Sequence, residues 1–349
     1  MEQKRQYNLD LLRILACFMV LVIHVSAQNW YTILPQSTEW QIFNIYDVFA
    51  RSSVPLFFML SGKLFLSRDD VSFKKLFSKN ILKLVFVYFL WSFLYAIDQI
   101  GIKNIISSPD LTLLFTTTVG SKYHLWYLPA LVSVYFLIPV FIGLKSYKNG
   151  KVLNYITILF VVFVVLKYSV MLLPMHQSFI NLLNKFSFVF DIHCGFFLFG
   201  HILDKYQEKL KKIPSFVLLI IFFITGTLTA LGSYLLSVKT GTATEALYNY
   251  FIISTLIEAV TIFILFLRLS NLNINKTLGA IIKKISTYTL FVYLLHPFLI
   301  EHLYLWFGLN TLSLSPIISV PLISVILFVL GTVIAMILDK IPIIRKIFL

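Results

Sequence analysis

Two ionisable side chains, Arg13 and His24, lie within the first long apolar stretch of the chain, residues 9–28. Eleven residues at 100° each make three turns plus about 20°, so both side chains project from one face of a helix. At 1.5 Å per residue they are about 16 Å apart along the helix axis, roughly half of a bilayer core. Ionisable groups held at lipid depth are usually functional. The spacing therefore predicts a site with an anion-binding cation at one end and a base at the other.

Arg13 also has a purely structural interpretation. Its side chain could extend to phospholipid headgroups, with Asp10 as its ion-pair partner. That interpretation does not account for His24, a neutral imidazole on the same helical face. The positions on this face are separated by three or four residues and form one stripe with polar members at both ends: Asp10, Arg13, Cys17, Val20, His24 and Gln28.

The second apolar stretch, residues 46–67, carries Ser61, Gly62 and Lys63 in its expected cytoplasmic half, at a depth comparable to that of Arg13. Small side chains such as Ser and Gly let either a neighbouring helix or a ligand approach closely. The sequence favours neither alternative. Lys63 could extend to the interface or add positive potential for a cytoplasmic anion. We expect these three residues to contribute to donor binding together with Arg13.

Further polar side chains are expected on the outer side of the membrane. Each histidine among them could be a hydrogen-bonded residue of a helix bundle, but a set from several helices at similar depth could line one water-accessible cavity. Either of the two acids in the set could orient the imidazole of His24. The set comprises His124 and Trp126 at the start of residues 125–143, Asp191 and His193 in 188–204, Glu258 in 247–269, and His296 in 287–307.

Ten apolar stretches long enough to cross a membrane must position these side chains. They predict an all-α, polytopic membrane helical bundle that forms a single domain over residues 1–349. Twenty-one Lys and Arg residues fall at the termini and in the even-numbered connections, against five on the opposite side, which places both termini in the cytoplasm. The stretches are 9–28, 46–67, 81–100, 125–143, 153–173, 188–204, 214–236, 247–269, 287–307 and 315–338.

The composition supports a membrane protein and excludes several other classes. Of the 349 residues, 59% are hydrophobic and 13% are charged, whereas a soluble domain is about half apolar and a quarter charged. The formal charge of +14 comes from clusters between apolar stretches, so topology explains it better than a nucleic-acid partner does. Cys17 and Cys194 are isolated within apolar stretches and encode neither a disulfide framework nor a metal site.

Several motifs in this chain resemble those of acyltransferase family 3, a family of integral membrane enzymes. The first helix has Arg13, ten residues and then His24, and the second has the run Ser53-Val54-Pro55-Leu56-Phe57-Phe58-Met59-Leu60-Ser61-Gly62. Further along are Tyr123-His124-Leu125-Trp126-Tyr127 with Pro139, and Ser286-Thr287-Tyr288-Thr289-Leu290 through His296-Pro297. The chain looks most similar to the stand-alone bacterial branch that O-acetylates cell-surface glycans. It departs from the family pattern at Lys63, where an aromatic residue commonly follows the Ser-Gly pair.

The resemblance implies a multi-pass enzyme of the bacterial cytoplasmic membrane that takes acetyl-CoA from the cytoplasm as its co-substrate. The acceptor would be a hydroxyl of a cell-surface polysaccharide or a lipid-linked glycan, with no metal involved. Arg13 would hold a phosphate of the donor, and His24 would take the proton of the attacking hydroxyl. Direct transfer and an acyl-enzyme are both left open. The sequence would place His124, Trp126, His193 and His296 around the acceptor.

The main rival interpretation is a transporter or flippase, because intramembrane His, Asp and Glu residues also mark proton relays and substrate paths. Inverted repeats and paired broken helices are not visible in the sequence. A non-enzymatic assembly or sensor protein offers no reason for so many ionisable groups at lipid depth. The spacing of Arg13 and His24 suits a long, thin donor, which favours the enzyme.

Overall fold

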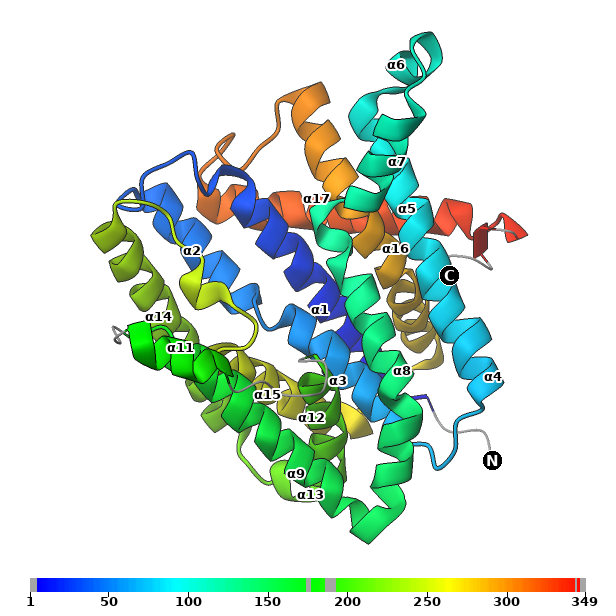
Figure 1. The fold of residues 1–349 in the computed structure, drawn as a ribbon, viewed down its shortest axis with the longest axis vertical. Helices are drawn as coiled ribbons and strands as arrows, with labels where there is room; N and C mark the ends of the chain where they lie inside the picture. The colour runs from blue at the N-terminus through cyan, green and yellow to red at the C-terminus, as the bar shows by residue number, and fades with distance from the viewer. Residues whose placement is uncertain (1–4, 174–176, 186–192, 343, 346–349) are drawn as a thin grey trace.

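Helices are the only regular elements in the described part of the computed structural model, which covers residues 5–173, 177–185, 193–342 and 344–345 (Figure 1). The α-helices are α1 Tyr7–Ser26, α2 Thr38–Ala50, α3 Ser53–Leu66, α4 Phe73–Lys75, α5 Leu82–Ile100, α6 Ile102–Ser107, α7 Leu111–Gly120, α8 Tyr127–Ser146, α9 Lys151–Phe160, α10 Lys167–Val170, α11 Gln177–Lys185, α12 Cys194–Lys205, α13 Gln207–Leu210, α14 Ser215–Thr240, α15 Ile253–Arg268, α16 Lys276–Phe307 and α17 Pro316–Leu338. Short 3₁₀ segments are η1 Ala27–Asn29, η3 Tyr123–Trp126, η4 Tyr147–Gly150, η6 Ala246–Tyr248 and η7 Leu269–Asn271, and π segments are η2 Leu76–Ile81 and η5 Val161–Leu166.

Eight helical stretches of the described residues are long and apolar enough to cross a membrane, so the prediction of an all-α polytopic membrane bundle is confirmed. One of them, Tyr123–Val170, contains the fourth expected span and most of the fifth. Positive φ angles at Lys148, Asn149 and Gly150 turn the chain between α8 and α9 within that stretch. The sixth expected span, 188–204, lies partly outside the described residues. Ten spans and cytoplasmic termini stay predictions.

Helix α1 lies in the interior of the bundle (Figure 1). It packs against α2, α3, α15, α16 and α17, and most of its side chains are buried. The N-terminal helix is therefore the element around which several other spans are arranged. Polar residues on α1 consequently face protein on most sides, which is the setting in which intramembrane ionisable groups are tolerated.

Helices α2 and α3 follow one another beside α1, separated by a turn at Arg51 and Ser52 (Figure 1). Pro55 has no N–H to give to the carbonyl of Arg51, so a continuous α-helical ladder cannot pass this point. Asp47 and Arg51 form an ion pair just before the turn, and the Arg51 guanidinium lies 4.6 Å from the ring centre of Tyr248. Asp47 and Arg51 are four residues apart, so their ion pair spans one turn at the end of α2.

Several spans present large apolar side chains on the outside of the bundle. Exposed fractions reach 54% at Phe89 on α5, 63% at Leu228 on α14 and 59% at Ile317 on α17. Exposed apolar surface on this scale would be a liability in water, and in a membrane it is the surface that lipid covers.

Candidate active site

Arg13, Cys17 and His24 all face α16, so one side of α1 carries the polar stripe expected from the sequence. The Nη1 atom of Arg13 donates a hydrogen bond to Ser286 Oγ at 3.0 Å, and Cys17 Sγ lies 3.4 Å from the carbonyl oxygen of Thr289. Ten residues beyond Ser286, the ring centre of His296 lies 4.9 Å from that of His24. Residues further along α1 contact residues further along α16, so the two helices run parallel here.

The inner end of this stripe is a network of charges and hydroxyls around the buried carboxylate of Asp10. Arg5 donates to both carboxylate oxygens, at 2.7 and 2.9 Å. Ser286 donates to Oδ1 at 2.8 Å, and Arg13 Nη1 lies 3.5 Å from the same oxygen. Two guanidinium groups therefore share one carboxylate, which leaves the cluster with a net positive charge. The side chain of Arg13 remains 30% exposed.

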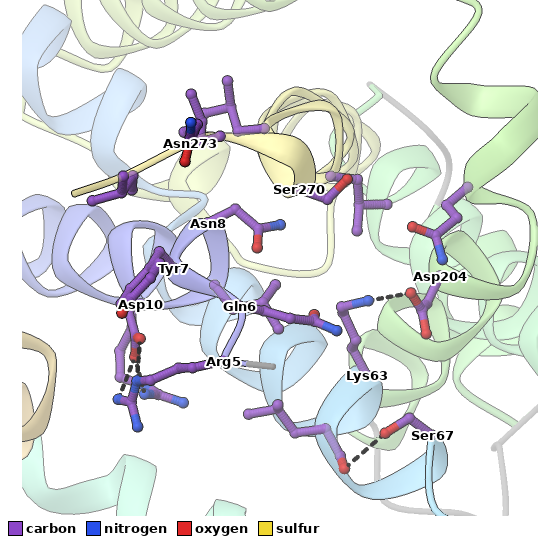
Figure 2. Close-up of a pocket in the computed structure, with 18 of the residues that line it drawn as sticks. Arg5, Gln6, Tyr7, Asn8, Asp10, Lys63, Ser67, Asp204, Ser270 and Asn273 are labelled. Atoms are coloured by element: carbon purple, nitrogen blue, oxygen red, sulfur yellow. Dashed lines mark hydrogen bonds and ion pairs between the residues drawn. The ribbon is translucent and has the colours of Figure 1, made fainter. Parts of the chain in front are cut away.

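A cavity of about 900 Å³ opens beside this network (Figure 2). Arg13 is one of the residues that line it. Four cationic side chains and two carboxylates line it, so its formal charge is positive. A cavity of this size matches the usual range for small-molecule and cofactor sites. Its charged lining residues are Arg5, Asp10, Arg13, Lys63, Arg68 and Asp204.

Lys63 lies in the same cavity wall, but its ammonium group is paired with Asp204 of α12 (Figure 2). The lysine is buried, and a buried ammonium without a counter-ion would be strongly unfavourable. If Lys63 contacts the donor as predicted, Asp204 belongs to the same site, because its carboxylate group is already paired with the ammonium group of Lys63.

Gly62 lies in the tight crossing of α3 and α12. A Cβ atom at Gly62 would lie 1.7 Å from the backbone oxygen of Phe197, and one at Gly200 would lie 1.8 Å from that of Met59. The two glycines bring the backbones together, as small residues do between membrane helices. Gly62 does not line the cavity, and neither does half-buried Ser61. Helix packing explains Gly62 here, and ligand contact by Ser61 and Gly62 stays a prediction.

The outer end of the stripe is a cluster of three histidines from α1, η3 and α16. The ring centre of His296 lies 4.9 Å from that of His24 and 5.3 Å from that of His124, and Tyr123 lies 5.2 Å from His24. His124 and His296 are buried, whereas His24 is half-buried. The structure thus brings together three of the histidines selected from the sequence.

Pro297 fixes the protonation pattern of His296. Because proline has no N–H, the carbonyl group of Tyr293, four residues earlier, loses its usual helical donor. His296 Nδ1 lies 2.5 Å from that carbonyl oxygen. A carbonyl only accepts, so Nδ1 carries a proton, and in the neutral imidazole Nε2 then keeps a lone pair. Nε2 is buried and has no hydrogen-bond partner among the described residues, which leaves a free acceptor beside His24.

Tyr95 of α5 bridges the same interruption in α16. Its hydroxyl donates to the carbonyl oxygen of Leu294 at 2.8 Å and accepts from the backbone N–H of Phe298 at 3.3 Å. A side chain inserted in this way supplies the hydrogen bonds that a proline-containing helix lacks. The histidine cluster is therefore held by a bridged, proline-containing helix.

Trp126 and His193 form a separate aromatic contact. Their ring centres are 5.6 Å apart, and His193 stacks on Phe58 at 5.1 Å. Tyr127 links this group to the histidine cluster, because it lies 5.2 Å from Phe58 and 5.8 Å from Tyr293. The substrate role expected for Trp126 and His193 stays a prediction.

Of the two acids expected to orient His24, the structure describes only Glu258. Asp191 lies outside the described residues. Glu258 is buried on α15, its Oε1 atom has no hydrogen-bond partner in the described part of the chain, and no described contact joins it to His24. Among the described side chains, the rings beside His24 are those of His296 and Tyr123, and no carboxylate of the described residues contacts His24.

The large cavity ends at the level of Arg13. Its wall includes Arg13 and Lys63 but none of the three clustered histidines. A ligand held by Arg13 must therefore extend about 16 Å further along α1 to meet His24.

Sequence reasoning missed several cavity residues, namely Arg5, Arg68 and Asp204, and the hydroxyl of Ser286 as a partner of Arg13. One signal was available: a lysine at lipid depth requires a counter-ion, although nothing in the sequence pointed to Asp204.

A family model described as an acyltransferase domain matches residues 6–340, nearly the whole chain. No curated protein and no solved structure matches the chain.

Proposed function

The chain belongs to acyltransferase family 3, and from this premise we propose that it acetylates a hydroxyl group of a cell-surface polysaccharide or lipid-linked glycan, with acetyl-CoA from the cytoplasm as the donor. It is a multi-pass membrane protein with the domain of an acyltransferase. The cytoplasmic membrane of a bacterium is the setting in which such a donor and such an acceptor lie on opposite sides.

The observation that carries the proposal is the shared orientation of Arg13 and His24. Both face α16, one beside a positively charged cavity and the other within a cluster of imidazoles. A donor with phosphates at one end and a thioester at the end of a thin arm has the same polarity. Its phosphates suit the guanidinium group of Arg13, and its acyl carbon suits a position near His24.

In the proposed reaction, the oxygen of the acceptor hydroxyl attacks the carbonyl carbon of the thioester. A new C–O bond forms, the C–S bond breaks, and the coenzyme A thiolate leaves. His24 takes the proton from the attacking hydroxyl, a transfer that contributes about 10²–10⁴ in rate when the base is well placed. The lone pair on His296 Nε2 offers a second acceptor for a hydroxyl in the same place.

The test uses the purified protein in lipid nanodiscs, with acetyl-CoA and an acceptor glycan fraction, and measures coenzyme A release. We expect His24→Ala to lower the rate by about 10²-fold or more while the protein remains folded and inserted. His201→Ala on α12 is the matched control, because His201 lies outside the histidine cluster and should retain activity. Full activity of His24→Ala would remove the assignment of the base.

Two further measurements separate the donor and acceptor parts of the proposal. Inverted membrane vesicles supplied with acetyl-CoA should release coenzyme A, whereas a transporter would move a substrate without cleaving the thioester. Mass spectrometry of surface glycans from a strain lacking the gene should show the loss of O-acetyl groups. An unchanged acetyl pattern would refute the proposed acceptor class.

A further inference from the structure

A second groove, of about 500 Å³, lies between the N-terminal half of α16 and the end of α17. It shares no lining residue with the large cavity. Ser286 of α16 points to Arg13 of α1, whereas Lys283, Thr287 and Tyr288 line the groove, so the groove lies on a different face of α16 from the one that contacts Arg13. We propose that this groove binds the phosphodiester headgroup of an anionic phospholipid from the cytoplasmic leaflet.

The charge of the groove supports an anionic ligand. Lys283, Lys284 and Arg345 line it against one carboxylate, that of Asp339. Neither lysine has a carboxylate partner within the described ranges of the chain. Basic groups in a pocket between helices on the cytoplasmic side are the usual recognition element for anionic headgroups.

Asp339 is already occupied by partners of its own, so it does not neutralise the lysines. Its Oδ2 atom accepts a hydrogen bond from the hydroxyl of Tyr288 at 2.9 Å, and its Oδ1 atom lies 3.4 Å from Arg345 Nε. The ion pair holds the guanidinium at the groove while its remaining N–H groups stay available. A planar guanidinium is well suited to two oxygens of one phosphate.

The surroundings of the groove distinguish a lipid from a free anion. Exposed apolar side chains lie within two residues of lining residues along the chain, with exposed fractions of 50% at Ile281 on α16, 58% at Ile337 on α17 and 44% at Ile341 just after α17. A phospholipid would place its phosphodiester among the cations and its acyl chains along these side chains. Free phosphate would gain nothing from the apolar surface, so the combination favours a lipid.

The position along the chain agrees with the cytoplasmic leaflet. The groove lies at the start of α16 and the end of α17, where the excess of Lys and Arg in the sequence predicts the cytoplasmic side. Anionic lipids give that surface a negative potential, and each nearby Lys or Arg contributes a factor of about 5 in binding.

The experiment measures binding of phosphatidylglycerol to the detergent-purified full chain by native mass spectrometry, with phosphatidylcholine as the neutral reference. The variant Lys283→Gln/Lys284→Gln should weaken phosphatidylglycerol binding by about 30-fold, since two cations are removed, and leave phosphatidylcholine binding unchanged. The matched control is Lys74→Gln/Lys75→Gln in α4, an adjacent, exposed pair with the same change of charge that does not line the groove. That control should bind phosphatidylglycerol as the wild type does.

Equal weakening in both double variants would overturn the proposal, because it would mean that net charge and not the groove determines binding. Competition by inorganic phosphate provides the second arm. If millimolar phosphate displaces phosphatidylglycerol as well as a short-chain phosphatidylglycerol does, the site takes a free anion and the lipid assignment is wrong. All four lysines are exposed, so the variants should fold, and an unchanged temperature of unfolding verifies this.

Discussion

Removal of the Arg13 side chain should weaken binding of the donor through its phosphates alone. We expect Arg13→Ala to raise the Kd for acetyl-CoA and to leave almost unchanged the Kd for acetyl-pantetheine, a thioester without the nucleotide phosphates. The prediction follows from the placement of Arg13 in the wall of the positive cavity, about 16 Å along α1 from His24. At that distance the guanidinium cannot contact the reacting carbon, so the rate of the chemical step should change little.

The magnitude follows from what Arg13 already binds. One N–H of Nη1 is used on Ser286, and Arg5 holds both oxygens of Asp10, so most donors of Arg13 remain available for a phosphate. A hydrogen bond to a charged group contributes about 1.5–3 kcal/mol. Because the side chain is 30% exposed, solvent screening favours the lower value, which corresponds to about a tenfold rise in Kd.

The assay is isothermal titration calorimetry on the purified protein with each donor, followed by steady-state kinetics. The ratio of the two Kd values is the quantity to compare, since loss of fold would lower both affinities together. Arg345→Ala is the matched control, because Arg345 does not line this cavity and its ratio should equal that of the wild type. If Arg13→Ala weakens both donors equally while its temperature of unfolding equals that of the wild type, the arginine acts through the Asp10 and Ser286 network and the phosphate role is refuted.

Three further substitutions test how the site is held. Pro297→Ala restores a backbone N–H that competes with the imidazole of His296 for the carbonyl of Tyr293, so we expect a lower kcat with little change in donor Kd, measured by steady-state kinetics. Tyr95→Phe leaves one carbonyl and one N–H of α16 without their partner and should lower the free energy of unfolding by about 1–3 kcal/mol, measured by denaturation in detergent. Gly62→Ala places a Cβ against the backbone of α12 and should lower the free energy of unfolding by about 1–3 kcal/mol or more in the same measurement. Gly143→Ala is the control, because the space around Gly143 is open, and it should leave the free energy of unfolding unchanged.

The fold class and family could be predicted because their signals are local. Apolar stretches of membrane length establish an all-α polytopic bundle, and the motifs from Arg13 to Pro297 are by themselves enough to indicate acyltransferase family 3. The alignment of Arg13 with His24 also follows from helical geometry alone. Both side chains lie toward α16, which is the face that this periodicity selects.

Partners from distant helices could not be predicted in the same way. The pairing of Lys63 with Asp204 joins residues 141 positions apart, and it depends on a close crossing of α3 and α12 that two glycines permit. The sequence shows that Gly62 is small but not which backbone approaches it. For the same reason, two acids were candidates to orient His24, whereas the described neighbour is His296.

The environment of His296 could be predicted from the sequence in part, because one of its contacts depends only on Pro297. A proline directly after a histidine in a helix frees the carbonyl three residues before that histidine. The sequence therefore already contains the acceptor that fixes the tautomer of His296. What the sequence does not contain is the packing that brings the rings of His24 and His124 beside that of His296.

The two ends of the candidate site differ in the kind of polarity that they present. Charges gather at the N-terminal end of α1, where Arg5, Asp10 and Arg13 form one network beside a cavity with excess positive charge. The end near His24 holds imidazoles and tyrosines, and no carboxylate of the described residues contacts the rings of His24 or His296. The charge that acts on His24 is that of Arg51, which is ion-paired with Asp47. A charge at lipid depth is expensive whereas a neutral imidazole costs less. The end at Arg13 therefore suits a phosphate group, and the end at His24 suits groups that carry no formal charge, as the proposed reaction requires.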